Sequence, residues 1–367
     1  MPVKLCIVIP TYNEKDNVKD IINSVSAVLG NNHWEIIFVD DDSPDGTSDL
    51  VREIASQNEH IRCIQRIKRR GLASACIEGI MASISPYVAV MDADLQHDEK
   101  ILPAMLQQLE LGNADLVIGS RYMDGGSTGT LSEFRTWISK SATRFSRLVI
   151  KDHITDPMSG FFMMKRTTFM HVVRHLSGKG FKILLDILVA CDPEVRVTEI
   201  PYQMKGRIHG ESKLDATVIW EFFTLIFYKL AGQLIPYRFL SFALVGLSGV
   251  FVQVGFLGLF YRILQTGFLQ AQIGATVLAM TSNFVLNNYL TFRQTRLKGR
   301  QIFTGLLSFY LACSIGAIMN VAMADFLYEQ SVHWWIASSF GAVTAAVWNY
   351  ATTATFTWGP KEGKPEN

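Results

Sequence analysis

The chain has 367 residues, with 34 Lys and Arg against 33 Asp and Glu, and a formal net charge of +1 at pH 7. This balance argues against a broad nucleic-acid-binding surface, which needs an excess of basic side chains. The five cysteines lie far apart without a CxxC pair, which predicts small core residues in a reducing compartment rather than a disulfide framework or zinc site.

Strand and helix patterns alternate along the first 120 residues. The start MPVKLCIVIP is too short an apolar run for a signal peptide and meets a proline. Short β-branched runs such as LCIVIP are typical of fully buried strands. Strands are predicted at 5–10, 35–40, 87–91 and 115–119, and helices at 15–30, 46–57 and 73–84. The alternation predicts an α/β fold with a mostly parallel, helix-covered sheet.

Polar segments follow the strands. They are PTYNE (10–14), DDDSPDGT (40–47), DADLQH (92–97) and SRYMDGG (120–126). Ligands of parallel α/β sheets bind outside the carboxyl ends of the strands. The four segments therefore predict one functional site at one edge of the sheet.

The segment DADLQH places two carboxylates one residue apart after a buried strand. If the chain stays extended, Asp92 and Asp94 point the same way, and each raises the pKa of the other unless a cation lies between them. With Gln96 they offer only oxygen ligands, which suits Mg²⁺ or Mn²⁺ and a substrate that carries a diphosphate. The alternative is a helix N-cap, with Asp94 or Asp98 capping a helix that begins near Glu99.

The second half of the chain is strongly apolar. Four segments without Asp, Glu, Lys or Arg are 239–261, 263–292, 302–324 and 330–360. Each is long enough to cross a bilayer, which takes about 20 apolar residues. Basic residues gather before the first, between the second and third, and after the fourth. The positive-inside rule then predicts a multi-pass membrane protein with a cytoplasmic N-terminal domain.

The segment ATVIWEFFTLIFYKLAGQLIP (216–236) is apolar and aromatic, with sparse charge. It predicts one or two helices lying in the membrane interface, and a core helix packed on the N-terminal domain is the alternative. The predicted division is 1–214 for a cytoplasmic domain, 215–236 for interfacial helices, 237–360 for a four-helix transmembrane domain and 361–367 for a cytoplasmic tail.

Eight motifs occur in a fixed order: PTYNE, VDDDSPDGT, GLASA, VMDADLQH, GSRY, DPMSGFF, GFKIL and GESKL. Together they resemble the family 2 glycosyltransferases, and among them the polyprenol-phosphate sugar transferases of the dolichol-phosphate mannose synthase type. The motifs cover residues 5 to about 214. The four-span half is similar in layout to a GtrA-like membrane domain. The resemblance implies a GT-A type fold with a Rossmann-like sheet.

The resemblance also implies roles for single residues. The donor nucleotide would be held by Pro10, Tyr12, Glu14, Val39, Asp41, Asp92, Arg207 and Lys213. The metal, Mg²⁺ or Mn²⁺, would be held by Asp92, Asp94 and Gln96. The acceptor phosphate would meet Arg121, Arg135 and Ser139. The catalytic candidates are Asp92, Asp94, Arg121 and Arg135.

Arginine suits these roles because it gives bidentate, permanently charged contacts to phosphate. The alternative for Arg121 and Arg135 is a solvated surface charge, and for GRIHGESK (206–213) a charged linker touching lipid headgroups. Asp156 in DPMSGFF could orient an arginine or cap a turn, and Asp186 is ambiguous in the same way. His209 departs from the family pattern and receives no role.

The activity that the resemblance implies is inverting transfer of mannose from GDP-mannose to dolichyl or polyprenyl phosphate at the cytoplasmic face of a prokaryotic membrane. UDP-glucose is the alternative donor, because no residue separates a guanine from a uracil pocket. A sugar-lipid flippase would make the spans the working part, yet their lack of charge argues against it. Without a QxxRW motif, a processive polysaccharide synthase is disfavoured. Self-association through the transmembrane domain stays open.

Overall fold

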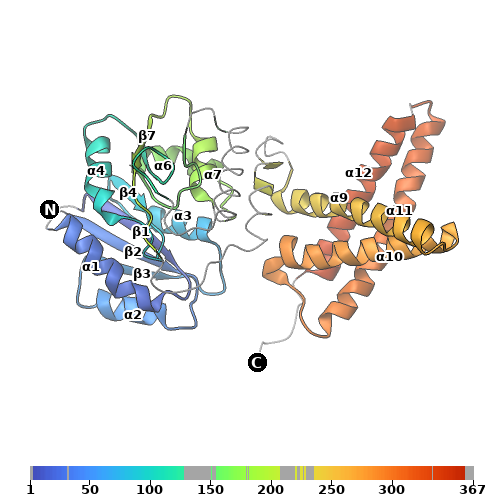
Figure 1. Cartoon of the computed structure of the whole chain (residues 1–367), viewed down its shortest axis with the longest axis horizontal. Helices are drawn as coiled ribbons and strands as arrows, with labels where there is room; N and C mark the ends of the chain where they lie inside the picture. The colour runs from blue at the N-terminus through green and yellow to red at the C-terminus, as the bar shows by residue number, and fades with distance from the viewer. Residues whose placement is uncertain are drawn as a thin grey trace. The chain divides into compact units, whose positions relative to one another are not determined.

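The computed structural model describes residues 3–30, 33–127, 150, 154–178, 180, 182–206, 220, 224–225, 227–228, 235–332 and 334–359. The chain divides into two compact units, Met1–Phe222 and Phe223–Asn367, which are called the first and second units below (Figure 1). The predicted interfacial segment 216–236 lies mostly outside the described residues, so its membrane placement stays a prediction.

The first unit contains a sheet of seven described strands in the order β3-β2-β1-β4-β6-β5-β7. The strands are β1 (Leu5–Thr11), β2 (Trp34–Asp40), β3 (Ile61–Gln65), β4 (Tyr87–Val90), β5 (Leu116–Ser120), β6 (Phe162–Lys165) and β7 (Val197–Pro201). Neighbouring strands run parallel except at β6, which is antiparallel to both β4 and β5. The predicted α/β fold with a mostly parallel sheet is confirmed.

Helices bury both faces of this sheet (Figure 1). The α-helices are α1 (Val18–Leu29), α2 (Thr47–Ala55), α3 (Leu72–Ala82), α4 (Leu102–Glu110), α6 (Arg166–Val172) and α7 (Ile183–Ala190), with short 3-10 turns η1 (Lys15–Asn17), η2 (Glu99–Ile101) and η3 (Val173–His175). Successive side chains of β1 alternate between the faces: Ile7 packs in the core with α1 and α4, and Val8 packs with α3 and α7. Burial on both sides explains why β1 is apolar throughout.

The strands β3 and β7 were not predicted, and β6, expected only as a strand after the turn in DPMSGFF, was not predicted to run antiparallel. β3 and β7 form the two edges of the sheet and are mostly half-exposed, so IRCIQ and VTEIP lack the continuous apolar run of a central strand. The reversed β6 has a direct consequence for function. Because β6 runs against its neighbours, the loop before it, Asp156–Gly160, lies at the edge where the parallel strands end. We call this segment the DPMSG loop.

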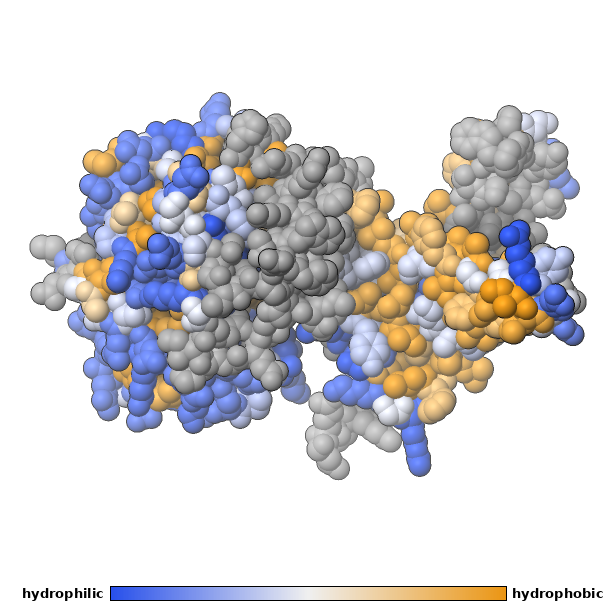
Figure 2. Space-filling view, in the orientation of Figure 1, coloured by the Kyte–Doolittle hydropathy of each residue, from blue (hydrophilic) through white to orange (hydrophobic). Residues whose placement is uncertain are grey.

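The second unit is helical, and its long helices coincide with the four charge-free segments. In the part of the chain that the structure describes they are α9 (Tyr237–Gly258), α10 (Phe268–Leu286), α11 (Gln301–Glu329) and α12 (Trp334–Thr352), with π-helical turns η4 (Leu259–Ile263), η5 (Asn287–Thr291) and η7 (Thr353–Thr357) and the 3-10 turn η6 (Arg293–Thr295). Among described residues, two helices, Tyr237–Ile263 and Gln301–Met319, are long and apolar enough to cross a membrane. Figure 2 shows apolar side chains over much of this unit, whereas the first unit is mainly hydrophilic.

The second unit consists of two helical hairpins with matching contacts. α9 packs on α10 in the first, and α11 packs on α12 in the second. Ser241 Oγ lies 2.9 Å from Thr291 Oγ1 in the first hairpin, and Ser308 Oγ lies 2.9 Å from Thr357 Oγ1 in the second. Each serine is followed eight residues later in its helix by a glycine: Gly249 follows Ser241, and Gly316 follows Ser308.

Those glycines make a second matching contact. A Cβ added at Gly249 would overlap the side chain of Asn283, and one added at Gly316 would overlap Asn349. Each hairpin then closes with a π-helical turn and an aromatic residue. Small residues let transmembrane helices approach closely, and amide and hydroxyl groups supply polar contacts between them. The repeat was not predicted from the sequence.

Candidate active site

The site lies at the carboxyl edge of the sheet, where β1 and β2 end in register. Thr11 pairs with Asp40. Asp40 is fully buried and accepts hydrogen bonds from Thr11 Oγ1 (3.0 Å), Ser43 N (2.9 Å) and Ser43 Oγ (2.5 Å). This carboxylate therefore ties the segment after β2 to the end of β1, next to Pro10 and Val39, which also pair in register.

The next carboxylate, Asp41, binds a basic segment rather than its own turn. Its Oδ1 lies 2.9 Å from Arg66 Nη1, and Gly71 N donates to its Oδ2 at 2.6 Å. Burial raises the pKa of Asp41 against the opposing effects of Gly71 and Arg66. The Arg70 guanidinium lies 4.4 Å from the centre of the Tyr12 ring. Two predicted nucleoside-binding residues, Tyr12 and Asp41, thus contact the same segment, 66–71.

Glu14, the second predicted nucleoside residue after β1, is held on both sides. Its backbone N donates to Thr47 Oγ1 at 3.2 Å, and its Oε2 accepts from Asn17 Nδ2 at 2.9 Å. Thr47 in turn donates to Asp45 Oδ1 at 2.6 Å. The segments after β1 and β2 therefore form one hydrogen-bonded wall of the site.

The chain does not stay extended after β4. The strand ends at Val90, a turn follows at 93–94, and Leu95 has a φ of 59°. The alternation that would point Asp92 and Asp94 the same way therefore does not apply. Asp94 Oδ1 accepts a hydrogen bond from Gln96 N at 3.2 Å. The loop, not strand geometry, places these side chains.

The N-cap alternative is settled by Asp98. Its Oδ1 accepts a hydrogen bond from Lys100 N at 3.3 Å and caps the short helix η2. Asp94 is not the cap of that helix. Gln96 is fixed from outside the loop, because its Nε2 donates to Lys205 O at 3.3 Å and its O accepts from Lys205 N at 2.9 Å.

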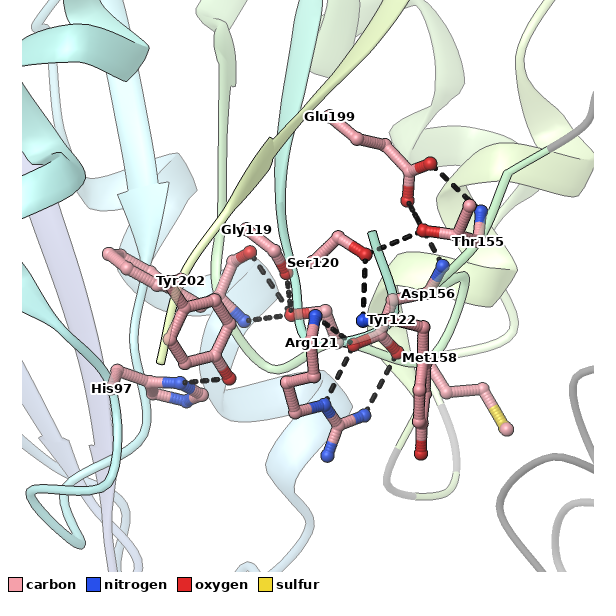
Figure 3. Close-up of polar contacts among 12 residues, drawn as sticks. His97, Gly119, Ser120, Arg121, Tyr122, Thr155, Asp156, Met158, Glu199 and Tyr202 are labelled. Carbon is pink, nitrogen blue, oxygen red and sulfur yellow. Dashed lines mark hydrogen bonds and ion pairs between the residues drawn. The ribbon is translucent and has the colours of Figure 1, made fainter. Parts of the chain in front are cut away.

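Asp92 contacts His97, which in turn contacts Tyr202, and neither residue had a predicted role. His97 Nε2 lies 3.3 Å from Asp92 Oδ2. His97 Nδ1 lies 3.0 Å from Tyr202 Oη (Figure 3). The His97 ring also packs on Phe161, with centroids 5.1 Å apart. Burial raises the pKa of Asp92, but the hydrogen bond to His97 and nearby positive charges outweigh it, so the pKa lies below its usual value. His97 and Tyr202 therefore fix the orientation of Asp92.

Arg121 is the best-fixed predicted residue of the site (Figure 3). Its Nε donates to Asp156 Oδ2 at 2.7 Å, its Nη2 donates to Asp156 Oδ1 at 2.9 Å, and its backbone N donates to Oδ2 at 3.2 Å. Burial opposes the charge of Arg121, but the hydrogen bonds to Asp156 outweigh it and raise the pKa of the guanidinium. Of the two roles left open for Asp156, orienting an arginine is the one observed.

Asp156 is held in turn by an edge strand. Glu199 on β7 accepts hydrogen bonds from Asp156 N (3.0 Å), Thr155 N (2.9 Å) and Thr155 Oγ1 (3.0 Å). Ser120 Oγ lies 2.6 Å from Thr155 Oγ1 (Figure 3). This chain of contacts fixes a charged guanidinium at the end of β5. The sequence gave no signal for Glu199, because its strand was not predicted.

Four predicted site residues, Arg135, Ser139, Arg207 and Lys213, lie outside the described residues. Among the residues that are described, no group of three or more His, Cys, Asp or Glu side chains is placed to hold a metal ion. The donor set of Asp92, Asp94 and Gln96 still fits a hard cation, since such ions prefer oxygen ligands and take several of them from water or substrate phosphates. Asp186, whose role was left open, accepts hydrogen bonds at its Oδ2 from Ser177 N and Ser177 Oγ, each at 2.7 Å.

The sheet with one reversed strand, the carboxylates after β4 and the fixed arginine after β5 define a glycosyltransferase of the GT-A type. Residues 6–173 match the glycosyl transferase family 2 model, and residues 241–358 match the GtrA/DPMS transmembrane domain. The chain is 35% identical over 361 residues to a dolichol-phosphate mannosyltransferase of Pyrococcus furiosus, across 97% of this chain and 99% of that protein. It therefore belongs to the dolichol-phosphate mannosyltransferases of glycosyltransferase family 2, and it is a membrane protein.

A shorter relative matches part of the chain. The dolichol-phosphate mannosyltransferase of Saccharomyces cerevisiae is 34% identical over 232 residues, which covers 60% of this chain and 85% of that protein. Among solved structures, glucosyl-3-phosphoglycerate synthase from Mycobacterium tuberculosis in complex with Mg²⁺ and UDP superposes with a TM-score of 0.48 at 17% identity, over 63% of this chain and 80% of that chain. That likeness is too distant to bear on substrate or cofactor.

Proposed function

We propose that this chain transfers mannose from GDP-mannose to the phosphate of dolichol or another polyprenol. The observation that carries the proposal is the 35% identity to the Pyrococcus furiosus dolichol-phosphate mannosyltransferase over 97% of the chain. That match includes both the first unit, which holds the polar site, and the apolar second unit, which would hold the lipid acceptor near it in the membrane.

The chemistry needs positioned charges more than a base. A phosphate monoester has a second pKa of about 6, so the acceptor is already largely anionic at neutral pH. An acceptor phosphate oxygen would form a bond to the anomeric carbon while the bond from that carbon to the diphosphate breaks. The configuration at this carbon inverts, and GDP is the leaving group. Holding two anionic substrates together is then the main task of the protein.

In the proposal, Arg121 helps to hold the two anionic substrates together. Its contacts with Asp156 use Nε and Nη2, and the rest of the guanidinium is available to meet the acceptor phosphate, with Arg135 and Ser139. Such preorganised positive charge acts most strongly where water is excluded. Arg207 and Lys213 would add charge beside the donor phosphates, and Pro10, Tyr12, Glu14, Val39 and Asp41 would hold the nucleoside.

Asp92, Asp94 and Gln96 would hold Mg²⁺ or Mn²⁺. When bound, the ion would supply positive charge to the leaving diphosphate. The contact of Asp92 with His97 and the hydrogen bond from Gln96 Nε2 to the Lys205 carbonyl support this assignment, because groups that orient metal ligands raise metal affinity.

In the proposed topology, residues 237–360 cross the membrane four times, residues 215–236 lie in the interface, and the catalytic domain 1–214 and the tail 361–367 are cytoplasmic. The basic residues at the ends of the charge-free segments support this orientation. The lipid phosphate would reach the site from the cytoplasmic leaflet of a prokaryotic plasma membrane. Copies of the chain would associate, if at all, through the second unit.

A transfer assay in detergent tests the proposal. Full-length protein receives polyprenyl phosphate, Mg²⁺ or Mn²⁺, and labelled GDP-mannose or UDP-glucose in separate reactions, and label is counted in the lipid fraction. We expect label from GDP-mannose, lost with EDTA and in Asp94→Ala. Label from UDP-glucose alone would overturn the donor. No label from either, in protein that binds nucleotide, would overturn the activity.

A further inference from the structure

Lys182 is a half-buried lysine that no role above uses. It lies in the motif GFKIL, directly before α7. Its Nζ donates to Met158 O at 3.4 Å, which is a long hydrogen bond. Among the described residues no carboxylate lies within ion-pair distance of this ammonium. An ammonium has three donors, so the structure leaves most of its capacity to bind an anion unused.

The DPMSG loop places Lys182 within the site. Asp156 at the start of the loop holds Arg121, and Met158 in the middle accepts the bond from Lys182. Gly160 at its end lies so close to Asp92 that an added Cβ would overlap the carboxylate. One five-residue segment therefore contacts the acceptor-side arginine, Lys182 and the donor-side aspartate in turn (Asp156 and Met158 are shown in Figure 3).

The surrounding charges favour an anion at Lys182. Burial lowers the pKa of Lys182 and the positive charge of Arg121 lowers it further, against the opposing charges of Asp92 and Asp156. Both carboxylates already have partners, since Asp156 binds Arg121 in a bidentate contact and Asp92 contacts His97. Two cations that repel one another are stable together when a phosphate lies between them.

We propose that Lys182 binds a phosphate oxygen where the two substrates of the transfer meet, and so is a catalytic residue beside Arg121. The inference rests on the proposed transfer between two phosphate-bearing substrates. The phosphate belongs either to the donor diphosphate, on the Asp92 side, or to the lipid phosphate, on the Arg121 side. A purely structural lysine would instead do no more than hold the DPMSG loop through Met158.

The test compares Lys182→Met and Lys182→Arg with Lys165→Met in the full-length protein in detergent. Lys165 is the matched control, because its Nζ bonds Asp115 Oδ1 at 2.7 Å and it pairs with Tyr87, at the start of β4, away from the site. GDP with Mg²⁺ and a short-chain polyprenyl phosphate are each titrated directly, and thermal unfolding is recorded. We expect Lys182→Met to weaken the binding of one of the two ligands about 10- to 100-fold, as for a lost charged hydrogen bond. We expect Lys182→Arg to recover part of that affinity.

Each binding result either supports or overturns the role proposed for Lys182. Weaker GDP binding places Lys182 on the donor, weaker polyprenyl phosphate binding places it on the acceptor, and either result supports the inference. Unchanged binding of both ligands in folded Lys182→Met protein would overturn it, as would an equal loss in Lys165→Met. Because the titrations do not depend on sugar transfer, an inactive wild-type chain would refute the proposed function without deciding the role of Lys182.

Discussion

The two units bury polar groups in different ways. In the first unit the site contains buried pairs of acidic and basic side chains, such as Arg121 with Asp156 and Arg66 with Asp41. In the described part of the second unit, buried contacts use neutral groups, such as Ser241 with Thr291. A site for anionic substrates needs fixed charges, whereas charge inside a bilayer is costly. Substrate chemistry therefore determines the buried polar residues of the first unit, whereas helix packing in a membrane determines those of the second.

The largest effect is expected at the buried ion pair. Asp156→Asn leaves Arg121 without its bidentate partner, and removing one member of a buried pair costs about 3–5 kcal/mol in the free energy of unfolding. Thermal and chemical unfolding of the purified protein would measure it. The matched control is Asp49→Asn, since Asp49 pairs with Arg52 on the exposed surface, where ion pairs contribute little. Equal losses in both variants would show that burial does not set the strength of the Arg121–Asp156 pair.

A smaller effect on stability, but a large one on activity, is expected at the DPMSG loop. Gly160→Ala places a Cβ where the Asp92 carboxylate lies, so the carboxylate must move. A displacement of about 1 Å at a reacting centre can cost about 100-fold in rate. Transfer kinetics would show it as a fall in kcat. Gly112→Ala is the control: it has a φ of 71° and open space around it, so it should lose stability without losing activity.

Overpacking at the Gly–Asn contacts should destabilise the second unit. Gly249→Ala and Gly316→Ala each force a Cβ against an asparagine, and such overpacking costs about 1–3 kcal/mol. Gly246→Ala is the control, because nothing lies within 4 Å of its added Cβ. Unfolding in detergent should rank the three variants, with GDP binding unchanged in all. A loss in the control equal to the others would refute the Gly–Asn contact as the cause.

The smallest effects are expected at the hydroxyl pairs. Ser241→Ala and Ser308→Ala each remove one side-chain contact between helices, which in membrane proteins averages about 0.6 kcal/mol. Because the two contacts have the same length, 2.9 Å, the two losses should be alike. Unfolding of the single and double variants would check this. A loss of several kcal/mol in either would show that neutral contacts stabilise as strongly as the buried ion pair.

Sequence patterns predicted the centre of the sheet and missed its edges. β1, β2, β4 and β5 were predicted because central strands need apolar side chains on both faces, whereas β3 and β7 are partly exposed. Asp92, Arg121 and Asp156 could be predicted because motifs mark them. Tyr202 and Glu199 could not, since their roles depend on contacts with residues about a hundred and about forty positions away in the chain.

The two hairpins escaped sequence analysis for a related reason. Few of their residues are identical, and the likeness lies in which residues touch. Asn288 even marks a difference: its Oδ1 accepts from Leu297 N at 2.8 Å and from Trp358 Nε1 at 3.0 Å, whereas the corresponding position of the second hairpin is Ala354. The loop after the first hairpin therefore folds back onto Asn288 through Leu297.

Phe292 and Trp358 end the two hairpins at corresponding positions, and their rings stack with centroids 4.3 Å apart and planes 3° from parallel. Corresponding residues touch only near the line that relates the two copies, so an approximate twofold rotation axis passes between these rings. Two further stacks, Phe284 on Trp358 at 24° and Tyr350 on Phe292 at 26°, are exchanged by that rotation. A change at Phe292 or Trp358 therefore alters, in a single substitution, a contact that both hairpins share at equivalent positions.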